Sequence, residues 1–203
     1  MTITPGTPCW WELRADDVVA ATAYYARRFG WTYRSKPARA EYCVALDTEG
    51  SEIGAIGPKV FGLTQTTAWA TFLHSPVLED SLALTIRNGG RVLTPPVELG
   101  ELGAFAVISD AVGATVGLWQ GLTMPGVQPS LGPGPARIAT SALLTPDPSA
   151  SESFYSHVFD AKPTIVSSPG SRSHWSPLFA SAQTATRGGP VGCEGESIRF
   201  LAV

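Results

Sequence analysis

The chain has 203 residues, of which 44% are hydrophobic and 9% aromatic, enough to bury the core of one ordinary domain and a smaller additional segment. Charged residues make up only 15%, which excludes a disordered or highly charged interaction protein. A net charge of −3, without any Lys/Arg cluster, argues against nucleic acid as a partner.

Cysteine usage and the N-terminal sequence indicate the compartment. The three cysteines, Cys9, Cys43 and Cys193, are too few and too scattered for a disulfide framework or a zinc site, so reduced thiols are expected. The N-terminus lacks the basic start and apolar run of a signal peptide. The sequence has no stretch of the ~20 apolar residues that cross a membrane. We therefore expect a cytoplasmic protein with no membrane partner.

A strand, a helix and three further strands are predicted over residues 8–56. Residues 8–14 alternate as in a strand. Asp16 or Asp17 can cap the helix that follows, and Gly30 stands where a left-handed glycine ends a helix. The predicted elements are a strand at 8–14, a helix at 18–28 and strands at 31–34, 42–46 and 52–56.

The same βαβββ order recurs over residues 69–120. A strand is predicted first, and then a helix that is stopped by Gly89 and Gly90. Three more strands complete the second repeat. The predicted elements are a strand at 69–73, a helix at 78–88 and strands at 91–94, 104–109 and 115–120.

A third, partial repeat follows a linker. Prolines and glycines make residues 123–137 extended and non-helical. A shift of 130 positions then matches residues in strand, helix-cap and buried-helix roles: Leu13 with Leu143, Asp17 with Asp147, Ala20 with Ala150, Tyr25 with Tyr155 and Phe29 with Phe159. Beyond residue 167 only 175–180 and 198–203 resemble strands. The predicted domains are paired repeats at 1–122, a linker at 123–137 and a third, degenerate repeat at 138–203.

This repeat order resembles the vicinal oxygen chelate superfamily, which includes glyoxalases, bleomycin-resistance proteins and dioxygenases. The nearest resemblance is to actinobacterial two-domain glyoxalase-like proteins, carried by PCWWEL (8–13) with FGW (29–31), GGRVLTPP (89–96) and SDAVGATVGLWQ (109–120). It implies an α+β fold in which two βαβββ repeats pair into a concave mixed sheet with external helices. Larger relatives carry four repeats, so three repeats suggest a truncated version of that pattern.

The resemblance also implies a metal site, which the sequence does not preserve. Active members usually bind a divalent metal through a histidine on the first strand of each repeat and a glutamate near the last strand of the second. Imidazole and carboxylate groups suit such metals. Here the corresponding positions hold Trp10, Trp69 and Gly117, with Thr140 in the third repeat. We therefore expect no metal and no cofactor.

Strand alternation predicts which residues line the cleft that the resemblance implies. The expected ligand-binding residues are Trp10, Trp69, Thr71, Gly117 and Trp119. The tryptophans either form an aromatic surface for a flat ligand or fill the space that a metal and water would occupy.

Glu12 is the candidate catalytic residue, because alternation places it on the same face as Trp10. A carboxylate among tryptophan rings is suited to act as a general acid or base. The alternative is a salt bridge or a solvated position at the rim. The three histidines, His74, His157 and His174, have no metal-ligand spacing and are interpreted as ordinary polar residues.

Three functions remain open. The first is a metal-free protein, similar to bleomycin-resistance relatives, that binds a small aromatic or natural-product molecule. The second is a metal-independent lyase, isomerase, cyclase or dioxygenase-like enzyme that uses Glu12. The third is an interaction module with a closed cleft. The unpaired third repeat further predicts a homodimer through residues 138–203, or else a degenerate cover that packs within its own chain.

Overall fold

The order of helices and strands confirms the predicted α+β fold. The structure, a computed structural model, describes residues 3–36, 39–59, 67–129, 137–180 and 199–201. The first repeat contains β1 (Pro8–Ala15), α1 (Val18–Phe29), β2 (Thr32–Lys36), β3 (Arg39–Leu46) and β4 (Glu52–Pro58). The second contains β5 (Ala68–His74), α2 (Leu78–Arg87), β6 (Arg91–Glu98), a 3₁₀ turn (Gly100–Leu102), β7 (Gly103–Ser109) and β8 (Thr115–Gly121). The third contains β9 (Arg137–Thr145), α3 (Pro148–Phe159), β10 (Thr164–Ser167), β11 (His174–Ala180) and β12 (Arg199–Leu201).

The strands form a large mixed sheet and a smaller second sheet. The large sheet has eight strands in the order β2-β3-β4-β1-β5-β8-β7-β6. β1 pairs with β4, and β5 with β8, in parallel, whereas the β2–β3, β3–β4, β6–β7 and β7–β8 pairs are antiparallel. The second sheet has the order β10-β9-β11-β12. The first and second repeats therefore show the same pattern, in which the first strand of the repeat pairs in parallel with its last strand.

The chain divides into two compact units, which are described separately. The first compact unit comprises residues 1–10, 71–128 and 141–176, and the second comprises 11–70, 129–140 and 177–203. Residues of the third repeat occur in both. The division into domains at 1–122, 123–137 and 138–203 stays a prediction.

The helices α1 and α3 begin and end in equivalent ways. Asp17 caps α1 by accepting a hydrogen bond from the Ala20 backbone N–H at 2.9 Å, and Asp147 caps α3 through Ala150 at 3.0 Å. Both helices end at a residue in the left-handed conformation, Gly30 and Asp160. The shift of 130 residues therefore matches the N-caps of α1 and α3 as well as the buried faces of these helices.

Helix α2 begins without a capping side chain of its own. Its N-cap residue, Val77, makes no side-chain hydrogen bond. Instead the backbone N–H of Leu78 donates to Oε1 of Gln120, at 2.7 Å, from the end of β8. A residue distant in sequence therefore satisfies one of the free N–H groups of the first turn.

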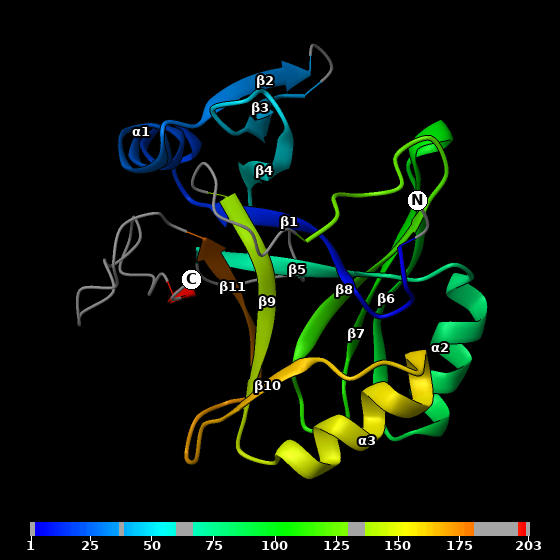
Figure 1. The fold of residues 1–203 in the computed structure, drawn as a ribbon. Helices are drawn as coiled ribbons and strands as arrows, with labels where there is room; N and C mark the ends of the chain where they lie inside the picture. The colour runs from blue at the N-terminus through cyan, green and yellow to red at the C-terminus, as the bar shows by residue number, and fades with distance from the viewer. Residues whose placement is uncertain (1–2, 37–38, 60–66, 130–136, 181–198, 202–203) are drawn as a thin grey trace. The chain divides into compact units, whose positions relative to one another are not determined.

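The core of the first compact unit lies between its helices and strands. In Figure 1, α2 and α3 lie next to each other, and α2 also contacts β7 and β8. The apolar face of α3 is fully covered within the same chain, because Phe154, Tyr155, Val158 and Phe159 belong to the same buried cluster as Ile108 and Leu118. This is the packing expected of a degenerate cover, and the homodimer stays a prediction.

The core of the second compact unit is aromatic. Tyr25 of α1 stacks on Trp31 with 5.1 Å between ring centroids, and Phe29 stacks on Phe179 at 5.3 Å. Trp69 meets this cluster edge-on, 5.6 Å from Tyr25 and 5.9 Å from Phe179. Offset stacking and edge-to-face contacts are the favoured geometries for aromatic pairs.

Equivalent Asp-x-x-Gly turns join the last two strands of the first and second repeats. In each turn one carboxylate oxygen accepts two backbone N–H bonds: Asp47 from Glu49 and Ser51, and Asp110 from Val112 and Ala114. Both aspartates are buried. Each turn closes with a glycine of positive φ, a conformation that the lack of a Cβ makes accessible.

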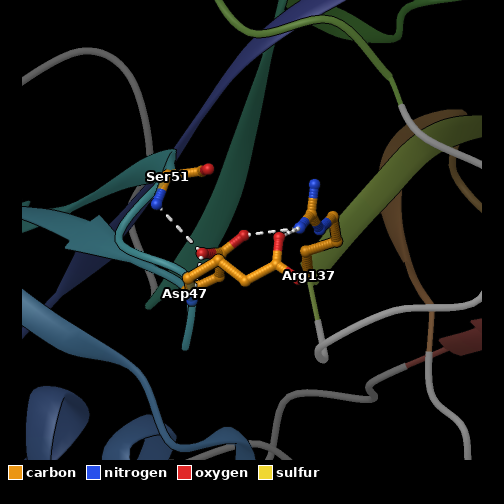
Figure 2. Close-up of polar contacts among 4 residues, drawn as sticks. Asp47, Ser51 and Arg137 are labelled. Carbon is orange, nitrogen blue, oxygen red and sulfur yellow. Dashed lines mark hydrogen bonds and ion pairs between the residues drawn. The ribbon is translucent and has the colours of Figure 1, made fainter.

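The second oxygen of each aspartate contacts a residue of the third repeat. Arg137 at the start of β9 forms an ion pair with Asp47, with 2.7 Å between Nη2 and Oδ2 (Figure 2). Arg137 also contacts the exposed Glu49 at 3.2 Å. In the first compact unit, the hydroxyl of Tyr155 donates to Oδ2 of Asp110 at 3.1 Å and accepts from Nε1 of Trp175 at 2.9 Å.

Burial of Asp110 has a consequence that depends on pH. Desolvation raises the pKa of Asp110, although its hydrogen bonds from Ala114, Val112 and Tyr155 oppose the shift. Desolvation also raises the pKa of Tyr155, so its hydroxyl stays a donor at neutral pH. A carboxyl whose pKa is higher in the folded state stabilises the fold below its ordinary pKa. It loses this contribution as pH rises toward the folded-state value.

Asp110→Asn tests the direction of this pH dependence. The free energy of unfolding of the wild type, relative to the variant, should fall as pH rises from about 4 into the range of the raised pKa. Urea unfolding followed by tryptophan fluorescence at a series of pH values measures the difference. A relative stability that rises with pH would mean that the hydrogen bonds outweigh desolvation.

Among the described residues, no helix is long and apolar enough to cross a membrane.

Candidate functional site

A buried charged cluster lies on β1 in the second compact unit. Glu12 and Arg14 form an ion pair, and their side chains are only 11% and 10% exposed. The hydroxyl of Tyr42, on β3, donates to the other carboxylate oxygen of Glu12 at 2.5 Å. The ion pair is the alternative that the sequence left open for Glu12, and its use as a general acid or base stays a prediction.

The register of three strands brings these side chains together. Glu12 and Arg14 are two residues apart on β1, so they share one face of the strand. Arg14 lies opposite Gly57 of β4. A Cβ at Gly57 would lie 3.0 Å from Cδ2 of Tyr42, so the glycine leaves room for the phenol ring. Tyr42 thereby reaches Glu12 across β4.

The cluster has no net charge but retains an unused donor. Both oxygens of Glu12 are engaged, one by Arg14 and one by Tyr42. The Nε of Arg14 is buried and has no hydrogen-bond partner among the residues that the structure describes. A buried donor of a charged group without a partner costs on the order of 1–3 kcal/mol. A neutral acceptor at Nε would add no charge to the cluster.

Trp69 is packed into the aromatic core of the second compact unit. Its indole Nε1 donates to the hydroxyl of Tyr25 at 2.9 Å. Its ring meets Tyr25, Trp31 and Phe179 edge-on. These contacts support a packing role, and ligand binding by Trp69 stays a prediction.

The structure does not bring Thr71 together with Gly117 and Trp119, all of which belong to the first compact unit. Phe72 lies opposite Gly117 in the parallel β5–β8 pair, so these two side-chain positions share a face with Trp119. Thr71, one residue away, lies on the other face and hydrogen-bonds to Ser141 at 2.9 Å. Thr71 therefore does not share a strand face with Gly117 and Trp119, and ligand binding by these three residues stays a prediction.

The ring of Phe72 fills the space beside Gly117. A Cβ at Gly117 would lie 2.2 Å from Cδ1 of Phe72, far inside van der Waals contact. The neighbouring Trp119 is also held in place, because its Nε1 donates to the carbonyl of Met124 at 2.8 Å. No side chain larger than hydrogen fits at position 117 without a shift of Phe72.

Trp10, Cys9 and His74 also lie in the first compact unit. Trp10 is buried, and whether it shares a cavity with Trp69 and Trp119 stays a prediction. Burial raises the pKa of the Cys9 thiol to about 12, so it is not a thiolate nucleophile at neutral pH. Burial lowers the pKa of His74, and its Nδ1 is buried with no hydrogen-bond partner among the described residues. A neutral imidazole is therefore expected there.

Comparison with known proteins identifies the family. No protein-family model matches the chain. A protein named as a glyoxylase, CFP32 of Mycobacterium tuberculosis, is 30% identical over 158 residues, which cover 75% of this chain and 59% of the relative. The anthracycline biosynthesis protein DnrV of Streptomyces peucetius is 28% identical over 169 residues, with 74% and 59% covered. With the βαβββ repeats, these relatives decide the assignment. The chain belongs to the vicinal oxygen chelate superfamily.

Solved structures agree with this superfamily at the level of the fold. The Mn(II)-bound glyoxalase of Novosphingobium aromaticivorans matches with a TM-score of 0.56 and 13% identity, over 91% of this chain and 67% of that one. A variant of homoprotocatechuate 2,3-dioxygenase from Brevibacterium fuscum matches with a TM-score of 0.60 and 12% identity, over 90% and 58%. The chain spans 59% of the length of its relatives CFP32 and DnrV.

The metal site implied by the vicinal oxygen chelate superfamily does not fit the residues of this chain. Two of the three ligand positions hold the buried tryptophans Trp10 and Trp69. The third is Gly117, where the ring of Phe72 occupies the space that a carboxylate side chain would need. Within the described ranges, no three His, Cys, Asp or Glu side chains are grouped so as to hold a metal ion.

The sequence predicted Glu12 but missed its partners Arg14 and Tyr42. The spacing of two residues on one strand could have indicated the Glu12–Arg14 pair. Tyr42 could not be found in this way, because its place beside Glu12 depends on the pairing of β1 with β4 and of β4 with β3.

Proposed function

We propose that this chain binds a small, flat aromatic or natural-product molecule without a metal ion. The observation that carries this proposal is the replacement of the metal-ligand positions by Trp10, Trp69 and Gly117, with Phe72 packed against the glycine. The name of the relative DnrV supports an aromatic ligand, since anthracyclines contain a planar fused-ring system. Aromatic side chains bury such rings at low entropic cost.

A second candidate function is a metal-independent enzyme of the same fold, such as a lyase, isomerase, cyclase or dioxygenase-like protein. The short hydrogen bond of 2.5 Å from Tyr42 to Glu12 favours it, because the pair could pass a proton to or from a bound molecule. In that case Glu12 would act as the acid or base.

A fluorescence titration tests the proposal. Doxorubicin, an anthracycline, is expected to quench the tryptophan fluorescence of the chain with saturation, because bound rings would lie near indoles. N-acetyltryptophanamide at equal absorbance provides the control for light absorbed by the probe. Linear quenching identical to that of the control would contradict the proposal.

The same samples separate metal-free binding from metalloprotein chemistry and from catalysis. Dialysis against a chelator should leave the titration unchanged, and metal analysis should find less than stoichiometric metal. Mass spectrometry of the probe after incubation should return it unaltered if the chain only binds. Conversion to a product, lost in Glu12→Gln, would support the enzyme instead.

A further inference from the structure

We propose that Arg14 recognises a neutral carbonyl oxygen of the bound aromatic molecule, so that the ligand class is an aromatic ketone or quinone. This inference rests on the proposed function and names the group that the Glu12–Arg14–Tyr42 cluster selects. The observation behind it is the Nε–H of Arg14, which is buried and has no hydrogen-bond partner within the described part of the chain. Buried polar groups almost always have one.

The charge of the cluster decides what kind of acceptor fits. The guanidinium of Arg14 is already neutralised by Glu12 in the ion pair. A ligand carboxylate would place a second anion beside Glu12 with no additional cation among the cluster residues, at a cost set by repulsion and desolvation. A carbonyl oxygen accepts the Nε–H bond and brings no net charge.

The geometry also restricts how the acceptor is held. The Nη2 group of Arg14 is directed to Glu12, and Glu12 is fixed on its other side by Tyr42. The guanidinium is planar and rigid, so these contacts fix the direction of Nε–H before a ligand arrives. Recognition of this kind adds selectivity because the donor is already desolvated.

Two matched probes test the proposal on the wild-type chain. 9-Fluorenone and fluorene share one flat ring skeleton, but only the ketone carries a carbonyl. We expect the fluorenone dissociation constant, from tryptophan quenching, to be about tenfold lower, the ratio expected for one hydrogen bond to a buried charged donor. Fluorene-9-carboxylate should bind more weakly than fluorenone.

Arg14→Lys provides the test on the protein side. Lysine keeps a positive charge for Glu12 but has no Nε–H in a fixed plane. The preference for fluorenone over fluorene should fall to within about twofold, while fluorene affinity should stay the same. The matched control is Arg34→Lys, which alters an Arg–Glu ion pair with Glu52 that is more exposed. It should leave the preference unchanged, and circular dichroism should show that both variants fold.

Each outcome has a definite meaning. Equal binding of both probes to the wild type would overturn the proposal, while the proposed aromatic binding would stand. Tighter binding of the carboxylate would also overturn it, in favour of an anion site. A preference that persists in Arg14→Lys would exclude Arg14. If neither neutral probe nor doxorubicin binds, the proposed function fails together with this inference.

Discussion

Gly117→Glu is expected to destabilise the fold severely, although it restores the residue type that the superfamily uses as a metal ligand. A Cβ at this position would lie 2.2 Å from the Phe72 ring. Overpacking of this kind costs about 1–3 kcal/mol or more, and burial of an unpaired carboxylate adds to it. We expect a loss of at least about 3 kcal/mol in the free energy of unfolding. Urea unfolding monitored by circular dichroism measures it.

A double-mutant cycle separates the steric cost from the cost of charge. Gly117→Ala should be destabilising by itself, and Phe72→Ala should be destabilising because it creates a cavity. The double variant should be more stable than the sum of the two losses implies, because the new methyl group occupies part of that cavity. Additive losses would show that Phe72 does not exclude a side chain at position 117.

Titration of the Gly117→Glu variant with Mn²⁺ should detect no tight binding of the metal.

The second large effect is expected for Arg137→Met. The variant leaves the carboxylate of Asp47, whose side chain is completely buried, without its cation. Removal of one partner of a buried pair costs about 3–5 kcal/mol. Two backbone N–H groups still donate to the other oxygen of Asp47, and the side chain of Arg137 is 23% exposed. We therefore expect a smaller loss, about 2–3 kcal/mol in the free energy of unfolding. Thermal and urea unfolding provide the measurement.

Glu49→Gln is the matched control for this prediction. Glu49 contacts the same guanidinium, but its side chain is 66% exposed. Its loss should change the free energy of unfolding by less than about 0.5 kcal/mol. In the Arg137→Met background, Asp47→Asn should cost less than it does in the wild type, since the uncompensated charge is already present. Equal effects of Arg137→Met and Glu49→Gln would contradict the prediction.

The repeated fold could be predicted because its signals are local. The cap at Asp17, the glycine that ends α1 at Gly30 and the alternation in β1 are all set by neighbouring residues, and the structure shows each of them. The match of Tyr25 with Tyr155 likewise placed both in buried helix faces. By contrast, β10 carries no clear pattern, because its four residues are mostly exposed and it forms by pairing with β9.

The candidate site could be predicted only in part, because it depends on contacts between distant strands. The spacing of two residues on one strand puts Glu12 and Arg14 on one face of β1, although this pair was not predicted. The sequence gives no register for the strands that bring Tyr42 close. The same limit explains Thr71, whose face follows from the pairing of Phe72 with Gly117. A hydrophobic pattern defines two faces of a strand, and only pairing with neighbouring strands decides which residues on other strands share them.

The equivalent turns at Asp47 and Asp110 affect which segments of such proteins can recombine during evolution. The two turns belong to the first and second repeats, yet the second carboxylate oxygen of each aspartate contacts a residue of the third repeat, Arg137 or Tyr155. Recombination that transferred only the two early repeats into another gene would carry two buried acids without their partners. Replacement of both aspartates by neutral residues would remove that cost. The smallest segment that keeps both acids with their partners is therefore the first two repeats together with β9 and α3.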